Sequence, residues 1–301
     1  MMQVEKEFHS GYVAILGKPN VGKSTLMNNL IGEKIAIMSA KAQTTRNRIM
    51  SILNTDKAQI IFLDTPGIHK PHHKLGNYMV KTALDTLKDV DVVLFVVDVT
   101  EKRKADEDDV LEVLRKAKQP VILVLNKIDL LRSQAEILRL IDTYSKEFPF
   151  AAVVPLSALQ DKELNGLVQE IEKHLPVGPH YFDEDVLTDQ AERVIAGEMI
   201  REKILISTRD EVPHSVAVEV NDFKERDNDT VYIRATIYVE RESQKGILIG
   251  AKGSMLKKIG QLARQDIENL LNTKVFVELW VKVRQDWRNS SAALKDFGYR
   301  E

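Results

Sequence analysis

Short apolar runs and helix-spaced apolar residues alternate along the first half of the chain. Residues 12–16, 92–97 and 121–125 are continuous apolar runs of strand length, which is typical of parallel strands that are buried on both faces. After the first and second of these runs, apolar side chains recur at helical spacing over residues 25–31 and 106–118. The alternation predicts an α/β domain in which a mostly parallel sheet is flanked by helices.

The remaining segments of this half continue the pattern. Residues 49–53 and 59–63 read as two strands of a hairpin, because a polar turn separates them. A helix at 136–146 and a strand at 152–156 close the half. Helical spacing after the hairpin predicts one more amphipathic helix, with an apolar face made of Leu75, Met79, Ala83, Leu84 and Leu87.

The pattern changes after residue 175. Residues 176–189 begin with Pro176-Val177-Gly178-Pro179 and then become acidic and aperiodic, which predicts a linker between a domain at 1–175 and a second domain at 190–301. The second domain has the predicted order α-β-β-α-α-β, with strands that alternate apolar and polar residues. Its main segments are a helix at 191–206, strands at 215–220 and 230–240, a helix at 254–271 and a strand at 274–283.

Composition narrows the classes of protein that fit. The chain has 301 residues, 44% hydrophobic residues and a net charge of −2, which suits a protein with well-packed cores. No apolar run approaches the roughly 20 residues that a membrane-spanning helix needs. The absence of cysteine excludes disulfides and thiolate chemistry. The polar N-terminus lacks a signal-peptide core, so we expect a cytoplasmic protein.

A phosphate-binding loop follows the first strand. The pattern G-x-x-x-x-G-K-[ST] is met without mismatch between a strand and a helix, which is the context that the motif requires. Its backbone amides and its lysine bind phosphates, and its serine ligates Mg²⁺. The alternative, a βα turn that binds nothing, leaves the lysine and serine unexplained. The predicted nucleotide-binding residues here are Gly17, Lys18, Pro19, Asn20, Val21, Gly22, Lys23, Ser24 and Thr25.

Two loops further along are placed to respond to the terminal phosphate. Thr45, with Thr44 as the second choice, lies in a polar stretch that can supply a threonine to the Mg²⁺ held by Ser24. An ordinary surface loop is the alternative for that stretch alone. The second loop follows a strand about forty residues after the phosphate loop, and its carboxylate can hold the metal through water. It consists of Asp64, Thr65, Pro66, Gly67 and Ile68. Such loops order or relax with hydrolysis.

Position 68 departs from many GTPases, in which a glutamine there orients the attacking water. Ile68 cannot hydrogen-bond to water, so we expect slow intrinsic hydrolysis or another device. The Asn20 side chain offers a neutral oxygen that could hold a monovalent cation against the phosphates. The alternative is that Asn20 only stabilises its loop.

Two more loops predict guanine recognition. Asn126-Lys127-Ile128-Asp129 follows a buried strand, and the Asp129 carboxylate can accept from N1–H and the 2-amino group of guanine, which adenine does not offer. Lys127 can lie along the base, while Asn126 can tie this loop to the phosphate loop. Ser157-Ala158 follows the last strand, where its amides can donate to guanine O6. All five loops lie at the carboxyl ends of strands in one sheet.

The second domain carries a candidate RNA-binding turn. A G-x-x-G turn between helices lets a nucleic-acid backbone approach closely. A plain helix–helix turn and a solvated basic face are the alternatives, but residues 245–300 hold eleven basic and only five acidic side chains. Single-stranded RNA is the favoured ligand, since such folds clamp about four nucleotides. The predicted RNA-binding residues are Gly250, Ala251, Lys252, Gly253, Lys257 and Lys258.

Taken together, these motifs resemble the Era GTPases, bacterial two-domain proteins with a C-terminal type II KH domain. The resemblance covers nearly the whole chain and implies a P-loop GTPase domain followed by an α+β type II KH domain. It implies binding of GTP, GDP and Mg²⁺, with Lys23, Thr45 and Gly67 as catalytic residues, and it favours K⁺ at Asn20.

The resemblance also implies partners. They are the 3′ end of small-subunit ribosomal RNA, the small ribosomal subunit during its maturation, and peripheral contact with the inner face of the cell membrane; we expect a monomer. Our hypothesis is an RNA-binding GTPase switch, in which the nucleotide state gates RNA capture. The alternative is a signalling switch whose second domain binds a protein or membrane surface. A dedicated ATPase is disfavoured by Asp129.

Overall fold

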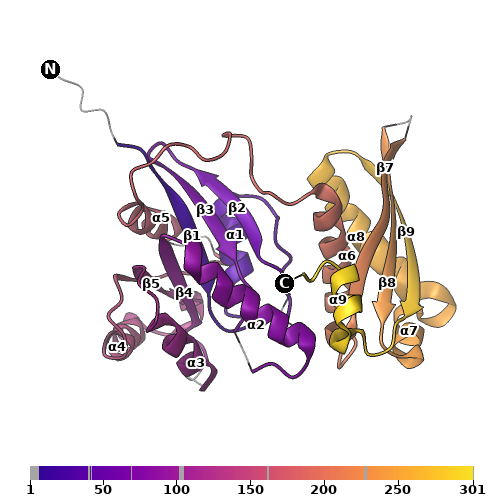
Figure 1. The fold of residues 1–301 in the computed structure, drawn as a ribbon, viewed down its shortest axis with the longest axis horizontal. Coiled ribbons are helices and arrows are strands. Elements are labelled where there is room, and N and C mark those ends of the chain that lie inside the picture. The colour runs from indigo at the N-terminus through magenta and orange to yellow at the C-terminus, as the bar shows by residue number, and fades with distance from the viewer. Residues whose placement is uncertain are drawn as a thin grey trace. The chain divides into compact units, whose positions relative to one another are not determined.

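The described residues of the chain form two compact units (Figure 1). The computed structural model describes residues 7–39, 41, 43–68, 70–101, 105–160, 163–226 and 229–300. The first unit runs to Ala36 and continues over Thr45–Lys70 and Met79–Asp189. The second unit takes Ile37–Thr44, Pro71–Tyr78 and the chain from Gln190 onward. Two short segments from the first half of the chain therefore belong to the second unit.

A six-stranded sheet organises the first unit. Its strand order is β2-β3-β1-β4-β5-β6, and every neighbouring pair is parallel except the β2–β3 hairpin. This confirms the predicted mostly parallel sheet. The continuous apolar runs are β4 and β5, which are buried along their whole length because both faces of the sheet are covered. The strands are β1 His9–Leu16, β2 Ile49–Asn54, β3 Ala58–Asp64, β4 Val92–Asp98, β5 Val121–Asn126 and β6 Ala152–Pro155.

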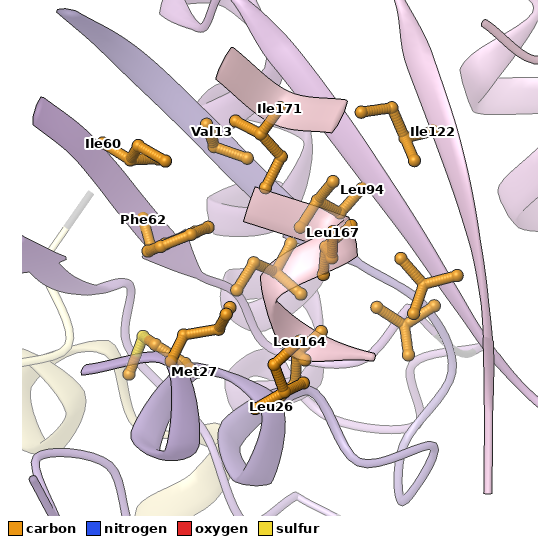
Figure 2. Close-up of a cluster of buried hydrophobic side chains, with 14 of the residues drawn as sticks. Val13, Leu26, Met27, Ile60, Phe62, Leu94, Ile122, Leu164, Leu167 and Ile171 are labelled. Atoms are coloured by element: carbon orange, nitrogen blue, oxygen red, sulfur yellow. The ribbon is translucent and has the colours of Figure 1, made fainter. Parts of the chain in front are cut away.

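Helices bury both faces of this sheet. Figure 2 shows the cluster on one face, where Leu26 and Met27 from α1 and Leu164 and Leu167 from α5 pack against inward side chains of the strands. The other face packs against α2, α3 and α4 in a second cluster. The helices are α1 Lys23–Ile31, α2 Lys74–Thr86, α3 Ala105–Leu114, α4 Gln134–Ser145 and α5 Leu164–Glu172. Short 3₁₀ turns lie at Leu87–Asp89 and Ile128–Leu130.

Two details of the helix predictions were wrong. Leu84 of α2 was expected to pack inward, but its side chain is 36% exposed, because the buried stripe of the helix runs through Met79 and Ala83. The helix expected to reach residue 118 ends at Leu114, where a turn leads into β5.

The predicted linker at 176–189 is packed along the edge of the first unit. The Ile52 N–H of the edge strand β2 donates to the Leu187 carbonyl at 2.9 Å, which satisfies a backbone group that an open edge would leave unpaired. The fully buried Gln59 side chain accepts from the Tyr181 and Phe182 N–H groups and donates to the Phe182 carbonyl. This acidic, aperiodic stretch therefore belongs to the first unit.

The second unit confirms the predicted order α-β-β-α-α-β. In its sheet, β7 and β8 are antiparallel and β8 and β9 are parallel. The first strand begins at Ala217 and extends six residues beyond the predicted end, through a bulge between Val220 and Asp222. The elements are α6 Glu192–Ser207, β7 Ala217–Arg226, β8 Thr230–Val239, α7 Glu242–Ile249, α8 Ser254–Leu271, β9 Lys274–Val283 and α9 Ser291–Asp296. The 3₁₀ turns are Pro213–Ser215, Ala251–Gly253 and Trp287–Asn289.

Strand alternation divides this sheet into two different faces. Ile233, Ala235 and Ile237 of β8 point into the core against α6 and α8, which lie side by side on that face (Figure 1). The residues between them, including Tyr232 and Arg234, therefore point to the opposite face. In this unit the structure brings together a helix-covered core face and a polar, aromatic outer face.

Candidate nucleotide and nucleic-acid sites

The phosphate loop is shaped by close approach of the backbone to its neighbours. Gly22 has a φ of +99°, and a Cβ there would lie 2.3 Å from the Asn126 Nδ2. Only glycine satisfies both the left-handed backbone and this contact. The loop then enters α1, whose N-terminal amides point toward the space where phosphates bind in loops of this type.

Lys23 is held ready for phosphate in the middle of this loop. Its ammonium is buried and donates to the Gly17 carbonyl at 3.2 Å and the Lys18 carbonyl at 2.9 Å. Burial lowers the pKa of Lys23 to about 8, although the Asp64 charge opposes that shift. The lysine is therefore a cation without a fully compensating anion, which a phosphate group would supply.

The predicted metal ligands converge on one point. The Ser24 hydroxyl donates to Asp64 Oδ2 at 2.7 Å, and the Thr45 hydroxyl lies 3.0 Å from that of Ser24. Asp64 is fully buried, its Oδ1 has no hydrogen-bond partner, and burial raises its pKa. Two hydroxyls and a buried carboxylate oxygen without a donor are the oxygen ligands that Mg²⁺ prefers, so these residues fit the ion.

Of the two threonine candidates, the structure brings only Thr45 to this point. The Thr44 hydroxyl instead donates to the Lys41 carbonyl at 2.6 Å, within its own loop. Thr45 is 7% exposed and its hydroxyl also lies 3.2 Å from Asp64 Oδ2.

The loop after β3 lies against the phosphate loop. A Cβ at Gly67 would lie 2.6 Å from the Pro19 nitrogen, and the Ile68 N–H donates to the Gly17 carbonyl at 3.3 Å. The Thr65 hydroxyl donates to the Ile15 carbonyl, which ties the two strand ends together. Pro66 is buried beside them. The Ile68 side chain packs in the core, so it contributes no hydrogen bond to a water molecule.

Asn126 joins three loops through one buried amide. Its Nδ2 donates to the Val21 carbonyl at 2.7 Å, and its Oδ1 accepts from the Ala158 N–H at 3.0 Å and the Lys127 N–H at 2.8 Å. The prediction that Asn126 ties the base-recognition loop to the phosphate loop matches this geometry. The third connection, to Ala158, places the last loop in the same cluster.

Lys127 is held in a left-handed conformation, with a φ of 69°. Its ammonium donates to the Asn20 carbonyl at 3.0 Å and to the Asp98 carboxylate. Burial would raise the pKa of Asp98, but hydrogen bonds from Lys127 and Thr100 outweigh it and lower the pKa. Asp98 at the end of β4 therefore stretches the lysine across the site, along the path of a base.

The base-recognition carboxylate lies half-buried at the end of this row. Asp129 Oδ1 accepts a hydrogen bond from the Ser157 hydroxyl. Ser157 and Ala158 are buried, with exposed fractions of 0% and 1%. Asp129, the Lys127 side chain and the amides after β6 thus surround one space, as the motif spacing predicts.

Two other loop residues have different surroundings. The Lys18 ammonium lies 2.8 Å from the Glu107 carboxylate of α3, which also accepts from the Tyr144 hydroxyl of α4. Lys18 therefore points away from the phosphate space and anchors the loop to two helices. Asn20 is exposed and has a φ of 67°, and its role as a K⁺ ligand stays a prediction.

The predicted RNA-binding turn joins α7 to α8. Lys252 has a φ of 51° and Gly253 a φ of 79°, so two successive residues are left-handed. Ala251, Lys252, Lys257 and Lys258 are exposed. A groove of about 390 Å³ begins at Gly253 and is lined by Gly253, Leu256, Lys257, Gly260, Gln261, Arg264, Phe276, Val277 and Leu279.

Some residues of these sites escaped the sequence reading. Asp98 was read only as the end of a strand, and Glu107 only as a helix residue. Arg264 and Phe276 lie beside the GxxG turn through tertiary packing. A carboxylate directly after a parallel strand was a usable signal for Asp98, whereas the pairing of Glu107 with Lys18 had none.

The lowered pKa of Lys23 predicts a pH effect on nucleotide binding. Above about pH 8 the free ammonium loses its proton, whereas bound phosphates would keep it charged, so binding takes up a proton. We expect the Kd for GDP to rise by up to about tenfold per pH unit above that value. Calorimetry at about pH 9 in two buffers of different ionisation enthalpy measures the uptake. Lys23→Arg should abolish proton uptake and exposed Lys57→Met should keep it; uptake that persists in Lys23→Arg would contradict this assignment.

Comparisons with known proteins agree with both sites. A family model described as a 50S ribosome-binding GTPase matches residues 12–127, and a KH domain model matches residues 211–288. GTPase Era of Ruminiclostridium cellulolyticum is 52% identical over 97% of this chain and 98% of its own. Two crystal structures superpose with a TM-score of 0.95, each at 46% identity over 98% of this chain and 100% of theirs.

One of those structures is an Aquifex aeolicus Era variant bound to GDP and AlF₄⁻. The other is Era in complex with MgGDPNP and nucleotides 1506–1542 of 16S ribosomal RNA. The identity and the coverage of both chains extend over the two units described above. The chain belongs to the Era family of GTPases.

Proposed function

We propose that this protein hydrolyses GTP and uses the nucleotide state to gate binding of single-stranded RNA from the 3′ end of small-subunit ribosomal RNA. The observation that carries the proposal is that one chain holds two complete sites. Five loops converge on a guanine-nucleotide site, and a basic groove adjoins a GxxG turn. Relatives support both parts, because one was crystallised with GDP and AlF₄⁻ and one with MgGDPNP and 16S ribosomal RNA.

In the nucleotide site, each residue has a role that its position supports. The amides of the phosphate loop and Lys23 bind the phosphate oxygens, and their fixed charges stabilise the charge that develops during phosphoryl transfer. Ser24, Thr45 and Asp64 would hold Mg²⁺, which bridges phosphate oxygens and neutralises their charge. The Gly67 N–H lies where it can contact a γ-phosphate. Asp129 would select guanine over adenine.

Hydrolysis must proceed without a water-orienting side chain at position 68. Ile68 packs in the core of the first unit, so we infer slow intrinsic turnover. A K⁺ ion held by the exposed Asn20 would add positive charge beside the phosphates, and this site stays a prediction.

The groove beside the GxxG turn suits an RNA strand. Backbone amides at the left-handed residues face outward, where a phosphate can approach. Lys257 and Arg264 supply charge along the groove, while Leu256 and Phe276 supply apolar surface for bases. The groove therefore combines backbone binding with base stacking.

A device for gating lies within the second unit. There the buried Arg201 of α6 donates to the carbonyls of Gln43 and Thr44, and Glu202 accepts from the Met38 N–H at 2.7 Å. Thr44 is joined by one peptide bond to Thr45, whose hydroxyl belongs to the metal cluster. A change at Thr45 on hydrolysis therefore alters the acceptor of Arg201 directly. A ligand shifts an equilibrium only through such differential contacts.

Two finer parts of the proposal concern location and assembly. We propose that the RNA partner is met during maturation of the small ribosomal subunit, with peripheral contact to the inner face of the membrane. Within the described ranges, no helix combines the length and apolarity that a membrane crossing needs. A signalling switch whose second domain binds a protein or membrane surface is the alternative, and it predicts no salt-sensitive RNA affinity.

Asp129→Asn tests guanine selection. The amide cannot accept from both guanine N–H groups, so GTP affinity should fall by about 100-fold or more while xanthosine triphosphate, with an oxygen at position 2, gains affinity. Equilibrium titration with both nucleotides measures the exchange of preference. The exposed Asp142→Asn should leave both affinities unchanged, and unaltered GTP binding in Asp129→Asn would exclude this carboxylate as the base reader.

Gly253→Asp tests the RNA-binding turn. A Cβ at Gly253 meets no atom within 4 Å, so the main change is a negative charge beside the phosphate path. RNA affinity should fall by about tenfold or more, and the loss should shrink at high salt. Gly253→Asn is the matched control, because asparagine has the same shape and tolerates the left-handed backbone. Equal losses in the two variants would show that charge is not the cause.

Arg201→Met tests gating. Without the guanidinium, the ratio of RNA affinities with a GTP analogue and with GDP should move toward one, while GTP affinity itself stays within about twofold. Fluorescence anisotropy of labelled RNA in both nucleotide states measures the ratio. Arg209→Met, at an exposed position beyond the same helix, should retain the wild-type ratio. A wild-type ratio in Arg201→Met would reject this route of coupling.

A further inference from the structure

The outer face of the β7–β8–β9 sheet carries large aromatic side chains in contact with solvent. Trp280 is 56% exposed and Phe276 is 54% exposed, both on β9. The other tryptophan of the chain, Trp287, is fully buried. Aromatic rings are rarely left in water without a partner, and an exposed patch of this kind marks an interaction surface.

The rings on this face are fixed in place by polar contacts. The Glu278 carboxylate accepts from the Trp280 indole N–H at 2.7 Å and from the Tyr232 hydroxyl at 2.5 Å. The Tyr232 and Phe276 rings stack with centroids 6.0 Å apart, and the Arg226 guanidinium lies 4.2 Å above Tyr232. The polar edges of Trp280 and Tyr232 are therefore satisfied within the protein. A ring fixed in this way loses little entropy when a partner stacks on it.

Cationic and hydrogen-bonding groups surround Trp280. A hollow of about 410 Å³ on this face is lined by Asn221, Arg234, Thr236, Trp280 and Lys282. Arg234 is half-exposed while paired with Asp222, and Lys282 is exposed. An indole beside two cations, an amide and a hydroxyl offers a stacking surface for a base, charge for a phosphate and partners for a base edge.

We propose that this outer face is a second docking surface for single-stranded RNA, occupied by nucleotides that follow those held in the GxxG groove. The proposal rests on the proposed RNA-binding function and deepens it. The occupant is RNA because aromatic rings alternate here with cations and amide groups, as in sheet platforms that stack bases. A lipid surface fits less well, since Glu278 and Asp222 would be buried with the rings.

The two surfaces are continuous at β9. Phe276 lines the groove beside Gly253 and also stacks on Tyr232 of the outer face. Trp280 lies four residues further along the same strand, at about 13 Å, and points to the same face. The groove accommodates about four nucleotides. A longer strand that leaves the groove past Phe276 therefore meets the Trp280 hollow next.

Tryptophan fluorescence provides a direct test, because Trp280 is exposed and Trp287 is buried. The probes are an RNA of nucleotides 1506–1542 of 16S ribosomal RNA, as in the related complex, and tetranucleotides cut from it. We expect the long RNA to quench Trp280 and shield it from acrylamide. The best-binding tetranucleotide should occupy the groove and leave the fluorescence unchanged. Trp280→Phe should remove the quenching.

Affinity measurements complete the test. Trp280→Ala should weaken the long RNA by about tenfold and the tetranucleotide by less than about twofold. Lys282→Ala should reduce the salt dependence for the long RNA by about 0.7 in the slope of log K against log salt. Ile206→Ala, which removes a similarly exposed apolar side chain from the end of α6, should change neither affinity.

Several outcomes would overturn the inference. If the long RNA binds with wild-type affinity to both Trp280→Ala and Lys282→Ala and leaves Trp280 unquenched, the outer face is not an RNA surface, although the groove function stands. Quenching of Trp280 by anionic vesicles but not by RNA would assign the face to a membrane and overturn the inference. If the wild-type protein binds neither RNA, the proposed function and this inference both fail.

Discussion

The nucleotide site depends on the buried amide of Asn126. One side chain donates to the phosphate loop and accepts from the amides of the two loops that would surround the base. A buried amide that lost any of these partners would leave an unsatisfied polar group, at a cost of about 1–3 kcal/mol. The contact also explains Gly22, because any larger residue there would collide with this amide. Phosphate recognition and base recognition are therefore mechanically joined.

Charges in the same site are arranged for a ligand more than for the stability of the free protein. Lys23 and Asp64 are both buried, and burial moves the pKa of each toward its neutral form. Phosphate and a divalent cation would supply the missing counter-charges and offset that cost. The site is thus organised before the nucleotide arrives, so little reorganisation accompanies the reaction. Lys18 is different, because Glu107 already neutralises it.

Local motifs could be predicted because their spacing alone places them at strand ends. The phosphate loop, Asp64, Asn126 and Asp129 all follow apolar runs that became strands of one sheet, and parallel strands present their carboxyl ends at one edge. Contacts between distant segments were not predictable. Glu107 meets Lys18 because α3 packs beside the phosphate loop, and residues 176–189 follow the edge of β2 because Gln59 and Ile52 bind them. A composition that resembles a flexible linker contains no record of such partners.

In the second unit, period-two alternation in the sequence already separated core-facing from solvent-facing residues. The GxxG turn and the surplus of basic residues likewise indicated phosphate binding before any coordinates. Only the tertiary structure brought Phe276 to both the groove and the outer face, and fixed Trp280 through Glu278. The same holds for Arg201, which grips a segment 157 residues earlier in the chain. The sequence by itself determined which chemistry each segment carries, because motifs and periodicity are local. Tertiary packing decided which of these segments meet, because contacts across a sheet or between helices depend on where the whole chain folds.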